Sequence, residues 1–216
     1  MGLFITFEGI EGCGKTTQVG LAAEFLDSEG ISHLVTEEPG ATPLGAHIRK
    51  LLLNRNSFSL NPEAELFLFL ADRAQHVRDV VLPALAEGKT VLCDRFSDAS
   101  IAYQGFGRGL EVDTVRMLDR VAAGTLRPDR TFLFDLPVET SIERAMRRIG
   151  SGQSVSPEDR FEREEIAFHR RVRKGYLDLA RKEPDRFVIV DGTGEIAAVQ
   201  GRVRTELIGL LRKNRK

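Results

Sequence analysis

Short apolar runs alternate with longer amphipathic segments along the whole chain. Runs rich in β-branched and aromatic residues predict buried strands at 3–7, 33–36, 90–93, 131–136 and 186–190. Apolar positions spaced three and four residues apart predict helices at 15–29, 44–52, 62–86, 112–123, 139–148, 159–181 and 195–211. This alternation predicts an α/β fold, with a five-stranded parallel sheet covered by helices on both faces.

Punctuating residues set the expected ends of these elements. Gly30 and Gly88 follow helical segments, as glycine does at a helix C-terminus, and Pro83 should bend the long segment 62–86. Small polar residues fill 149–158, which is typical of a flexible lid, here placed at about 147–160. Since no linker or repeat interrupts the pattern, we expect a single domain over 1–216.

The segment after the first predicted strand has the spacing of a phosphate-binding loop. Gly9-Ile10-Glu11-Gly12-Cys13-Gly14-Lys15-Thr16 matches G-x-x-x-x-G-K-[ST] and leads into a predicted helix. In that context backbone N–H groups converge on an anion, the lysine reaches the β and γ phosphates, and the threonine hydroxyl reaches Mg²⁺. An ordinary glycine-rich turn is the alternative. The flanking strand and helix favour an ATP site comprising Gly9, Ile10, Glu11, Gly12, Cys13, Gly14, Lys15, Thr16 and Thr17.

Further candidate groups follow in the second and third quarters of the chain. Phe69 and Arg73 are four residues apart, so on a helix they share a face that could hold a base and its phosphate. Asp94 and Arg95 follow a predicted parallel strand, where ligands bind in such sheets. The glycine-rich stretch 104–109 is either a mobile loop or a wall of the same pocket.

Composition narrows the class of protein. The formal net charge is −1, which argues against a dedicated nucleic-acid binder. Apolar runs fall short of the roughly 18 residues of a membrane span, so we expect no membrane partner. Cys13 and Cys93 are the two cysteines, and their spacing fits neither a metal site nor a disulfide framework, which favours a reducing cytoplasm.

Several motifs together resemble one family. The phosphate-binding loop, Glu38-Pro39-Gly40, the Phe69/Arg73 pair and the block D-R-x-x-x-x-S-x-A-Y-Q-G from Asp94 to Gly105 occur in order, and the chain looks like a bacterial thymidylate kinase. This resemblance implies the P-loop NTPase fold and a nucleoside monophosphate kinase. It also implies phosphorylation of dTMP to dTDP with ATP and Mg²⁺, in dTTP biosynthesis, by a cytoplasmic homodimer.

The resemblance also implies roles for individual residues. Thr16 and Asp94 would hold the metal. The catalytic set would be Lys15, Asp94, Arg95 and one or more of the lid arginines Arg147, Arg148 and Arg160. The dTMP subsite would comprise Glu11, Glu38, Pro39, Phe69, Arg73, Arg95, Ser100, Tyr103 and Gln104.

Two other readings stay open at this stage. A deoxynucleoside kinase also has a phosphate-binding loop, and Glu8 could then serve as the general base for a neutral hydroxyl. Against it, Arg73 and Arg95 suit an acceptor that already carries phosphate. A nucleotide-switched binding protein of the GTPase kind is less favoured, because the chain contains no guanine-reading Asn-Lys-x-Asp sequence.

Overall fold

The sheet at the centre of the molecule has five parallel strands. The computed structural model describes residues 2–54, 59–150 and 159–214. Within them the strand order is β2-β3-β1-β4-β5, and every pairing is parallel. The strands are β1 (Phe4–Glu8), β2 (His33–Glu37), β3 (Thr90–Asp94), β4 (Arg130–Asp135) and β5 (Phe187–Asp191). The predicted fold class is confirmed, and each predicted strand lies within one residue of its observed bounds.

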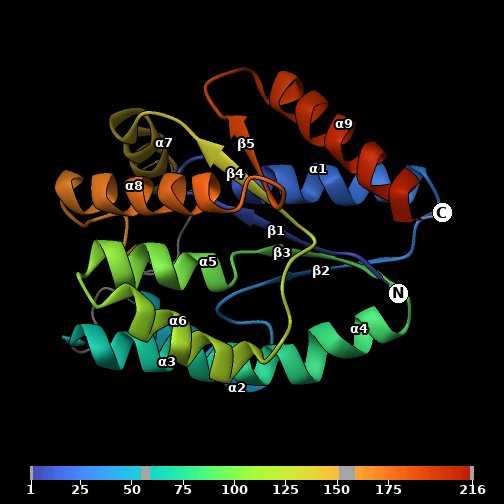
Figure 1. Cartoon of the computed structure of the whole chain (residues 1–216). Helices are drawn as coiled ribbons and strands as arrows, with labels where there is room; N and C mark the ends of the chain where they lie inside the picture. Colours follow the sequence, from blue (N-terminus) through green and yellow to red (C-terminus); the bar gives the residue numbers. More distant parts are fainter. Residues whose placement is uncertain (1, 55–58, 151–158, 215–216) are drawn as a thin grey trace.

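Helices connect the strands and cover both faces of the sheet (Figure 1). They are α1 (Lys15–Ser28), α2 (Pro43–Leu53), α3 (Pro62–His76), α4 (Leu82–Ala86), α5 (Ser97–Ser100), α6 (Val112–Ala123), α7 (Val138–Gly150), α8 (Ile166–Lys182) and α9 (Ile196–Asn214). Two π-helical segments, η1 (Val77–Val81) and η2 (Ile101–Gly107), continue α3 and α5. None of the helices in the described ranges is long and apolar enough to cross a bilayer.

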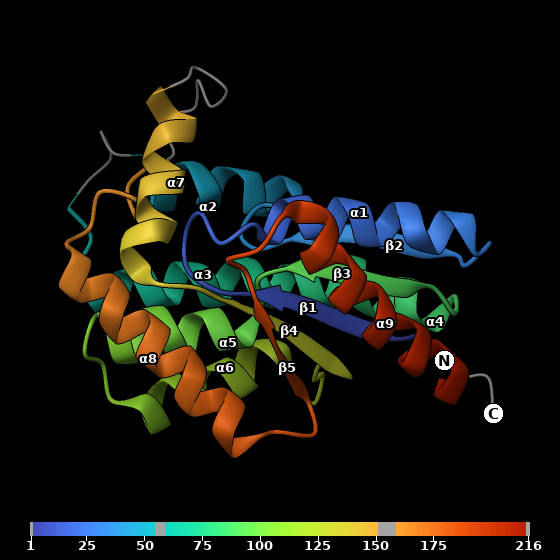
Figure 2. The same cartoon turned by 90° about the horizontal axis from the view of Figure 1, so that it is seen from above.

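Alternating side chains of β1 supply two separate cores. Ile5 and Phe7 point into a core shared with α1 and α9. Phe4 points to the opposite side and packs with η1 and α4. A third core joins α3, η2, α6 and α8. Figure 2 shows α1 and α9 over the sheet and α8 crossing beside α5 and α6. Both faces of the sheet are therefore buried under helices. The edge at which the parallel strands end remains accessible to ligands.

Two stretches fold as π-helix, where the sequence predicted a bent α-helix in one case and a glycine-rich loop or pocket wall in the other. The helical run 62–86 ends where expected, and its α-helical pattern changes to π-helix at η1, which ends two residues before Pro83. A π-bulge changes the helix register near a residue that lacks an N–H group. The glycine-rich stretch is largely helical and buried in η2, so the mobile-loop alternative is wrong and the wall alternative fits.

The helix predicted at 159–181 begins seven residues late, at Ile166. Residues 159–165 form turns instead, because their side chains are held by other elements. Phe161 is buried in the core, and Arg160 Nε donates to the Leu52 carbonyl oxygen. Tertiary contacts thus override the helical pattern of the charged residues. Of the predicted lid at 147–160, residues 151–158 lie outside the described residues.

Candidate active site

The phosphate-binding loop curves around Lys15, between β1 and α1. Lys15 Nζ donates to the carbonyl oxygens of Gly9, at 3.0 Å, and Ile10, at 2.9 Å. Gly12 has φ of +74°, and a Cβ atom there would collide with the Ser141 carbonyl oxygen. Glycine is required at this position because of the left-handed conformation and the close approach of α7. The loop therefore keeps a cation beside a helix N-terminus, where backbone N–H groups attract an anion.

A hydroxyl and a carboxylate meet beside the loop. Thr16 Oγ1 donates to Asp94 Oδ2 at 2.7 Å. Thr16 lies in the first turn of α1, which follows β1, and Asp94 lies at the C-terminal end of the neighbouring strand β3. Hard oxygen donors of this kind suit Mg²⁺. The pair predicted as the metal site is thus brought together by the sheet, although the two residues are 78 positions apart.

A cavity of about 610 Å³ lies at this edge of the sheet. Fifteen of the predicted site residues line it: Glu11, Gly12, Gly14, Lys15, Thr16, Thr17, Glu38, Pro39, Phe69, Asp94, Arg95, Ser100, Tyr103, Gln104 and Arg148. The predicted residues that do not line it are Gly9, Ile10, Cys13, Arg73, Arg147 and Arg160. The first three face the loop interior, where two of them supply the carbonyl groups that hold Lys15.

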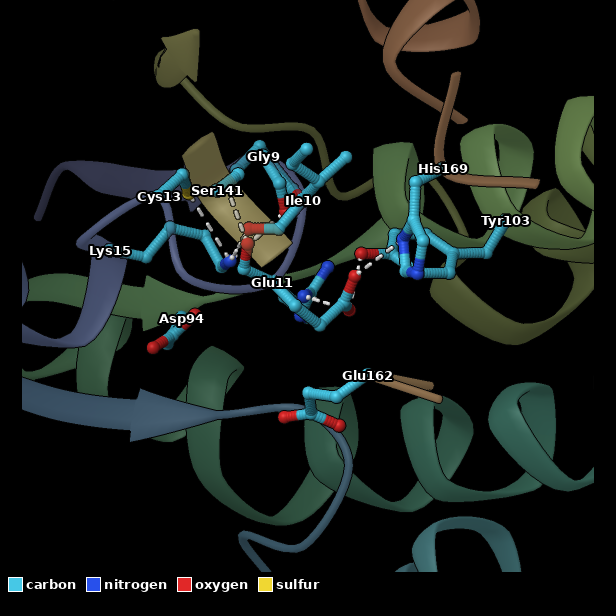
Figure 3. A network of polar contacts seen from close by, with 12 residues as sticks. Gly9, Ile10, Glu11, Cys13, Lys15, Asp94, Tyr103, Ser141, Glu162 and His169 are labelled. Atoms are coloured by element: carbon cyan, nitrogen blue, oxygen red, sulfur yellow. Dashed lines mark hydrogen bonds and ion pairs between the residues drawn. The ribbon is translucent and has the colours of Figure 1, made fainter. Parts of the chain in front are cut away.

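Glu11 stands at the centre of the polar wall, between Lys15 and Tyr103 (Figure 3). Its Oε1 accepts from Arg95 Nη2 at 2.8 Å and from Tyr103 Oη at 2.5 Å. Its Oε2 lies 3.3 Å from His169 Nδ1. Arg95 has φ of +69°, a strained conformation for a side-chain-bearing residue. Backbone strain of this kind concentrates at functional sites, and here it directs the guanidinium toward Glu11.

Electrostatics keep this wall charged. Burial raises the pKa of Glu11, but Arg95, His169, Lys15 and Tyr103 outweigh burial and lower that pKa to about 2. Glu162, on the facing wall, has its pKa raised by burial and by the charge of Glu11. The cavity thus has one firmly ionised carboxylate opposite a second one that protonates more easily.

The apolar part of the cavity is built from aromatic rings. Phe69 is half-buried, and its ring centroid lies 6.2 Å from that of Phe161. Phe161 in turn meets Tyr103 edge-on at 5.4 Å. Gln104 is nearly fully buried, and its amide nitrogen donates to Glu65 at 2.8 Å. A flat ring with an amide at its edge fits this slot.

Arg73 lies behind the wall rather than on it. Its side chain is 1% exposed, and its guanidinium donates to Glu38 at 2.8 Å, to Asp119 at 2.7 Å and to Ser100 at 3.0 Å. The other oxygen of Glu38 lies 2.8 Å from His76 Nδ1. Phe69 lines the cavity whereas Arg73 does not, and two carboxylates compensate the charge of the buried arginine. The expected sandwich of base and phosphate by Phe69 and Arg73 stays a prediction.

The three candidate lid arginines occupy different places. Arg148 lines the cavity and lies 3.4 Å from Glu162 Oε1. Arg147 is 72% exposed and pairs with Glu143 on its own helix. Arg160 pairs with the buried Glu65 at 2.7 Å. Of these three arginines, Arg148 is the one that lines the cavity.

Sequence reasoning missed several cavity residues. Arg144, on α7, donates to the Gly192 carbonyl oxygen at 2.9 Å and lines the cavity. The further missed lining residues are Glu37, Arg49, Leu53, Ala99, Ala145, Ile149, Phe161 and Glu162. Arg144 could have been predicted, because it lies four residues before Arg148 and so shares a helix face with it. Phe161 and Glu162 carried no such signal, since they fall in the stretch read as a regular helix.

Glu8, the base considered for a deoxynucleoside kinase, is fully buried and does not line the cavity. Its oxygens accept from the Phe96 N–H group and from Tyr176 Oη. A carboxyl group so enclosed cannot reach an acceptor hydroxyl. The deoxynucleoside kinase hypothesis therefore has no general base at Glu8.

A five-stranded parallel sheet with a phosphate-binding loop after β1, and with a second charged subsite beside it, defines a P-loop kinase of nucleotides. Comparisons with known proteins make this specific. The thymidylate kinase family profile matches residues 7–203. The chain is 55% identical to the thymidylate kinase of Desulfosudis oleivorans, over 93% of this chain and 94% of that one, and 53% identical to that of Syntrophus aciditrophicus, over 94% and 93%.

A crystal structure of thymidylate kinase from Ehrlichia chaffeensis matches with a TM-score of 0.74 and 33% identity, covering 95% of this chain and 98% of that one. The chain belongs to the thymidylate kinase family. It is an ATP-dependent nucleoside monophosphate kinase, and the predicted family, fold and enzyme class are confirmed.

Proposed function

We propose that the residues around the cavity divide the work of dTMP phosphorylation between a donor and an acceptor subsite. The activity follows from the family: the chain phosphorylates dTMP to dTDP with ATP, a step in dTTP synthesis. The observation that supports the division is that the phosphate-binding loop and the Glu11–Arg95 pair border one continuous cavity. Positioning and neutralisation of charge supply most of the rate in phosphoryl transfer.

At the donor subsite the loop from Gly9 to Thr17 holds the ATP phosphates. Its backbone N–H groups and the dipole of α1 attract the anion. Lys15 supplies the point charge at the β and γ phosphates, and leaves its loop carbonyl partners to do so. Arg144, which lines the cavity and is held by the Gly192 carbonyl oxygen, contacts the nucleoside part of ATP.

At the acceptor subsite Phe69 stacks on the thymine ring, and Gln104 reads an edge of the base. Arg95 clamps the phosphate of dTMP, while Glu11 accepts from the sugar hydroxyl. Tyr103 closes the sugar side together with Ser100, and its bulk disfavours a ribose 2′-hydroxyl. Each of these side chains lines the cavity.

Arg73 acts on the acceptor subsite indirectly. It holds Glu38 on the Glu38–Pro39 loop and the Ser100 hydroxyl at the same time. Glu38 and Pro39 line the cavity next to Phe69. We therefore assign Arg73 as the residue that fixes this wall, in place of the direct ligand contact expected from the sequence.

Mg²⁺ fits the pair formed by Thr16 and Asp94. In the described ranges, no cluster of three or more His, Cys, Asp or Glu side chains is placed to hold a metal ion alone. The ion would take its remaining ligands from phosphate oxygens and water, as is usual for Mg²⁺ in nucleotide sites. When bound, it neutralises charge on the β and γ phosphates. Asp94 then contacts it directly or through water.

The homodimer and the compartment are further parts of the proposal. Five exposed apolar side chains lie on the neighbouring helices α2, α3 and α6 (Figure 1). They form what we call the outer apolar face, comprising Leu44, Leu51, Phe67, Met117 and Val121. A patch of this kind is typical of an interface, and a second copy of the chain would cover it. Both cysteines are buried and unpaired, in keeping with a reducing cytoplasm.

A coupled ADP-release assay with ATP and Mg²⁺ tests the acceptor. Offered dTMP, dUMP, dCMP, AMP and thymidine in parallel, the enzyme should turn over dTMP with strong preference and leave thymidine unreacted. Thymidine should be inert because Arg95 contributes only when the acceptor carries phosphate. The preference over dUMP, dCMP and AMP should come from the contacts of Phe69, Gln104 and Tyr103 with the base and sugar. Turnover of thymidine would overturn the assignment of the acceptor subsite and revive the nucleoside kinase. An Arg95→Lys variant should lose most of the preference for dTMP over thymidine, because the bidentate contact of a guanidinium with the phosphate is removed.

A further inference from the structure

His169 is a buried titratable residue that the proposed roles leave unused. It lies on α8, is 0% exposed and does not line the cavity. Neither of its ring nitrogens makes a hydrogen bond to a described residue. Buried polar groups without partners are uncommon, so each one calls for a reason.

The same is true of one oxygen of Glu11. Oε1 is held by Arg95 and Tyr103, whereas Oε2 is buried without a hydrogen bond from any described residue. His169 Nδ1 faces this oxygen at 3.3 Å (Figure 3). A ring nitrogen that can donate thus stands opposite a carboxylate oxygen that can only accept.

The position of His169 on its helix is part of the arrangement. Tyr176 is seven residues further along α8 and therefore on the same face. Its Oη donates to Glu8 and lies 3.4 Å from Arg95 Nη1. One face of α8 therefore contacts both charged residues of the acceptor subsite from behind, Glu11 through His169 and Arg95 through Tyr176.

We propose that His169 is a positioning residue for the acceptor nucleotide. Its Nδ1, 3.3 Å from Glu11 Oε2, donates a hydrogen bond to that oxygen when dTMP is bound. This bond fixes the plane of the carboxylate, which in turn aligns Arg95 and Tyr103 with dTMP. The carboxylate of Glu11 is assigned to the sugar of dTMP, so His169 acts on dTMP more than on ATP. This inference rests on the proposed role of Glu11 at the sugar.

Steady-state kinetics of two variants tests it. His169→Leu keeps an apolar side chain of similar volume but removes the donor, and it should raise KM for dTMP about tenfold, the scale of one hydrogen bond to a charged group. KM for ATP should change less than about twofold, since its subsite is untouched. His169→Asn places an N–H donor near the Nδ1 position and should restore most of the loss.

Leu179→Ala is the matched control for packing. Leu179 is buried on the same helix, away from Glu11, so its truncation lowers the melting temperature without raising KM for dTMP selectively. Equal rises in both KM values for His169→Leu would show a merely structural role. Failure of His169→Asn to restore binding would also overturn the proposal.

A double-mutant cycle separates this inference from the role on which it rests. Glu11→Gln alone should raise KM for dTMP, and no rise would overturn the assignment of Glu11 itself. In the Glu11→Gln background, His169→Leu should add less than about twofold, because both changes act on one interaction. A full tenfold effect in that background would mean that His169 does not act through Glu11.

Discussion

Glu8 and Glu11 are three positions apart, yet the fold shifts their pKa values in opposite directions. Burial and the charge of Asp98 raise the pKa of Glu8 to about 8, against the pull of Arg95. Burial also raises the pKa of Glu11, but Arg95 and three further partners lower it to about 2. A guanidinium that makes a direct ion pair with Glu11 alone accounts for much of the contrast.

The shift of Glu11 predicts acid sensitivity. Its ordinary pKa is 4.5, so between pH 4.5 and about 2 the unfolded chain binds a proton that the folded chain does not. The contribution of Glu11 to the free energy of unfolding is therefore fully present above pH 4.5. It is lost as the pH drops toward 2, and it amounts to about 3 kcal/mol. The free energy of unfolding, measured from pH 7 to pH 3, should decline less steeply for Glu11→Gln. Parallel curves for the two proteins would contradict the prediction.

Arg148 is the lid arginine expected to act on the transferring phosphate. Arg148→Ala should lower kcat by about 10³-fold, the lower end of what such an arginine contributes, with a smaller change in KM for dTMP. Arg147→Ala is the matched control, because that neighbouring side chain is exposed and pairs on its own helix, and kcat should stay within about threefold. Steady-state assays of both variants give the two kcat values to compare. A greater loss for Arg147 or Arg160 would reassign the role.

At the scale of elements, α8 and η2 approach each other more closely than side chains usually permit. A Cβ atom at Gly107 would lie 2.7 Å from Phe168 and 2.8 Å from Val172, and one at Gly175 would lie 2.7 Å from Phe106. Each helix thus contributes a glycine where the other contributes a ring. This contact seats Tyr103 of η2 against α8, and so the glycine-rich stretch serves packing as well as the cavity wall.

Gly107→Ala should therefore destabilise the protein by about 1–2 kcal/mol, because overpacking against the buried Phe168 ring exceeds any gain in helix propensity. Gly201→Ala is the control: it lies in α9, no atom is within 4 Å of its added Cβ, and it should stabilise by about 0.5–1 kcal/mol. Chemical denaturation measures both. Stabilisation of Gly107→Ala to the same extent would show that the contact yields without strain.

At the scale of the molecule, the fold separates the catalytic edge from the outer apolar face. The cavity lies at the C-terminal ends of the strands, whereas the outer apolar face lies on helices that cover one side of the sheet. Assembly through that face would leave the cavity open in each copy. A dimer would also hold α3, which carries Phe69 and Arg73, from its outer side.

Charge on the outer apolar face should dissociate the dimer. In a Met117→Glu/Val121→Glu variant both changes lie at side chains that are more than half exposed, so the fold tolerates them. Sedimentation equilibrium should give twice the chain mass of 24.0 kDa for the parent protein and 24.0 kDa for the variant. Ile196→Glu, at an equally exposed position on α9, should remain dimeric. A monomeric parent protein would rule out the proposed homodimer.

Local chemistry determined much of this protein from the sequence alone. The strands could be predicted because a strand buried on both faces is apolar at nearly every position, as at 131–136. The phosphate-binding loop could be predicted because its glycines and lysine meet requirements set within a few residues. The position of Asp94 and Arg95 followed from the rule that parallel strands end at a common edge.

Only the tertiary structure decided which charged groups pair. Arg73 binds Glu38 and Asp119, 35 and 46 positions away, and its side chain does not line the cavity. Phe161 and Arg160 are anchored by distant elements, and therefore α8 begins later than its pattern predicts. Burial and the pairing of charges depend on groups that folding brings together. Such pairings cannot be predicted from the spacing of residues along the chain. The contact between His169 and Glu11, 158 positions apart by their numbers, is of this kind.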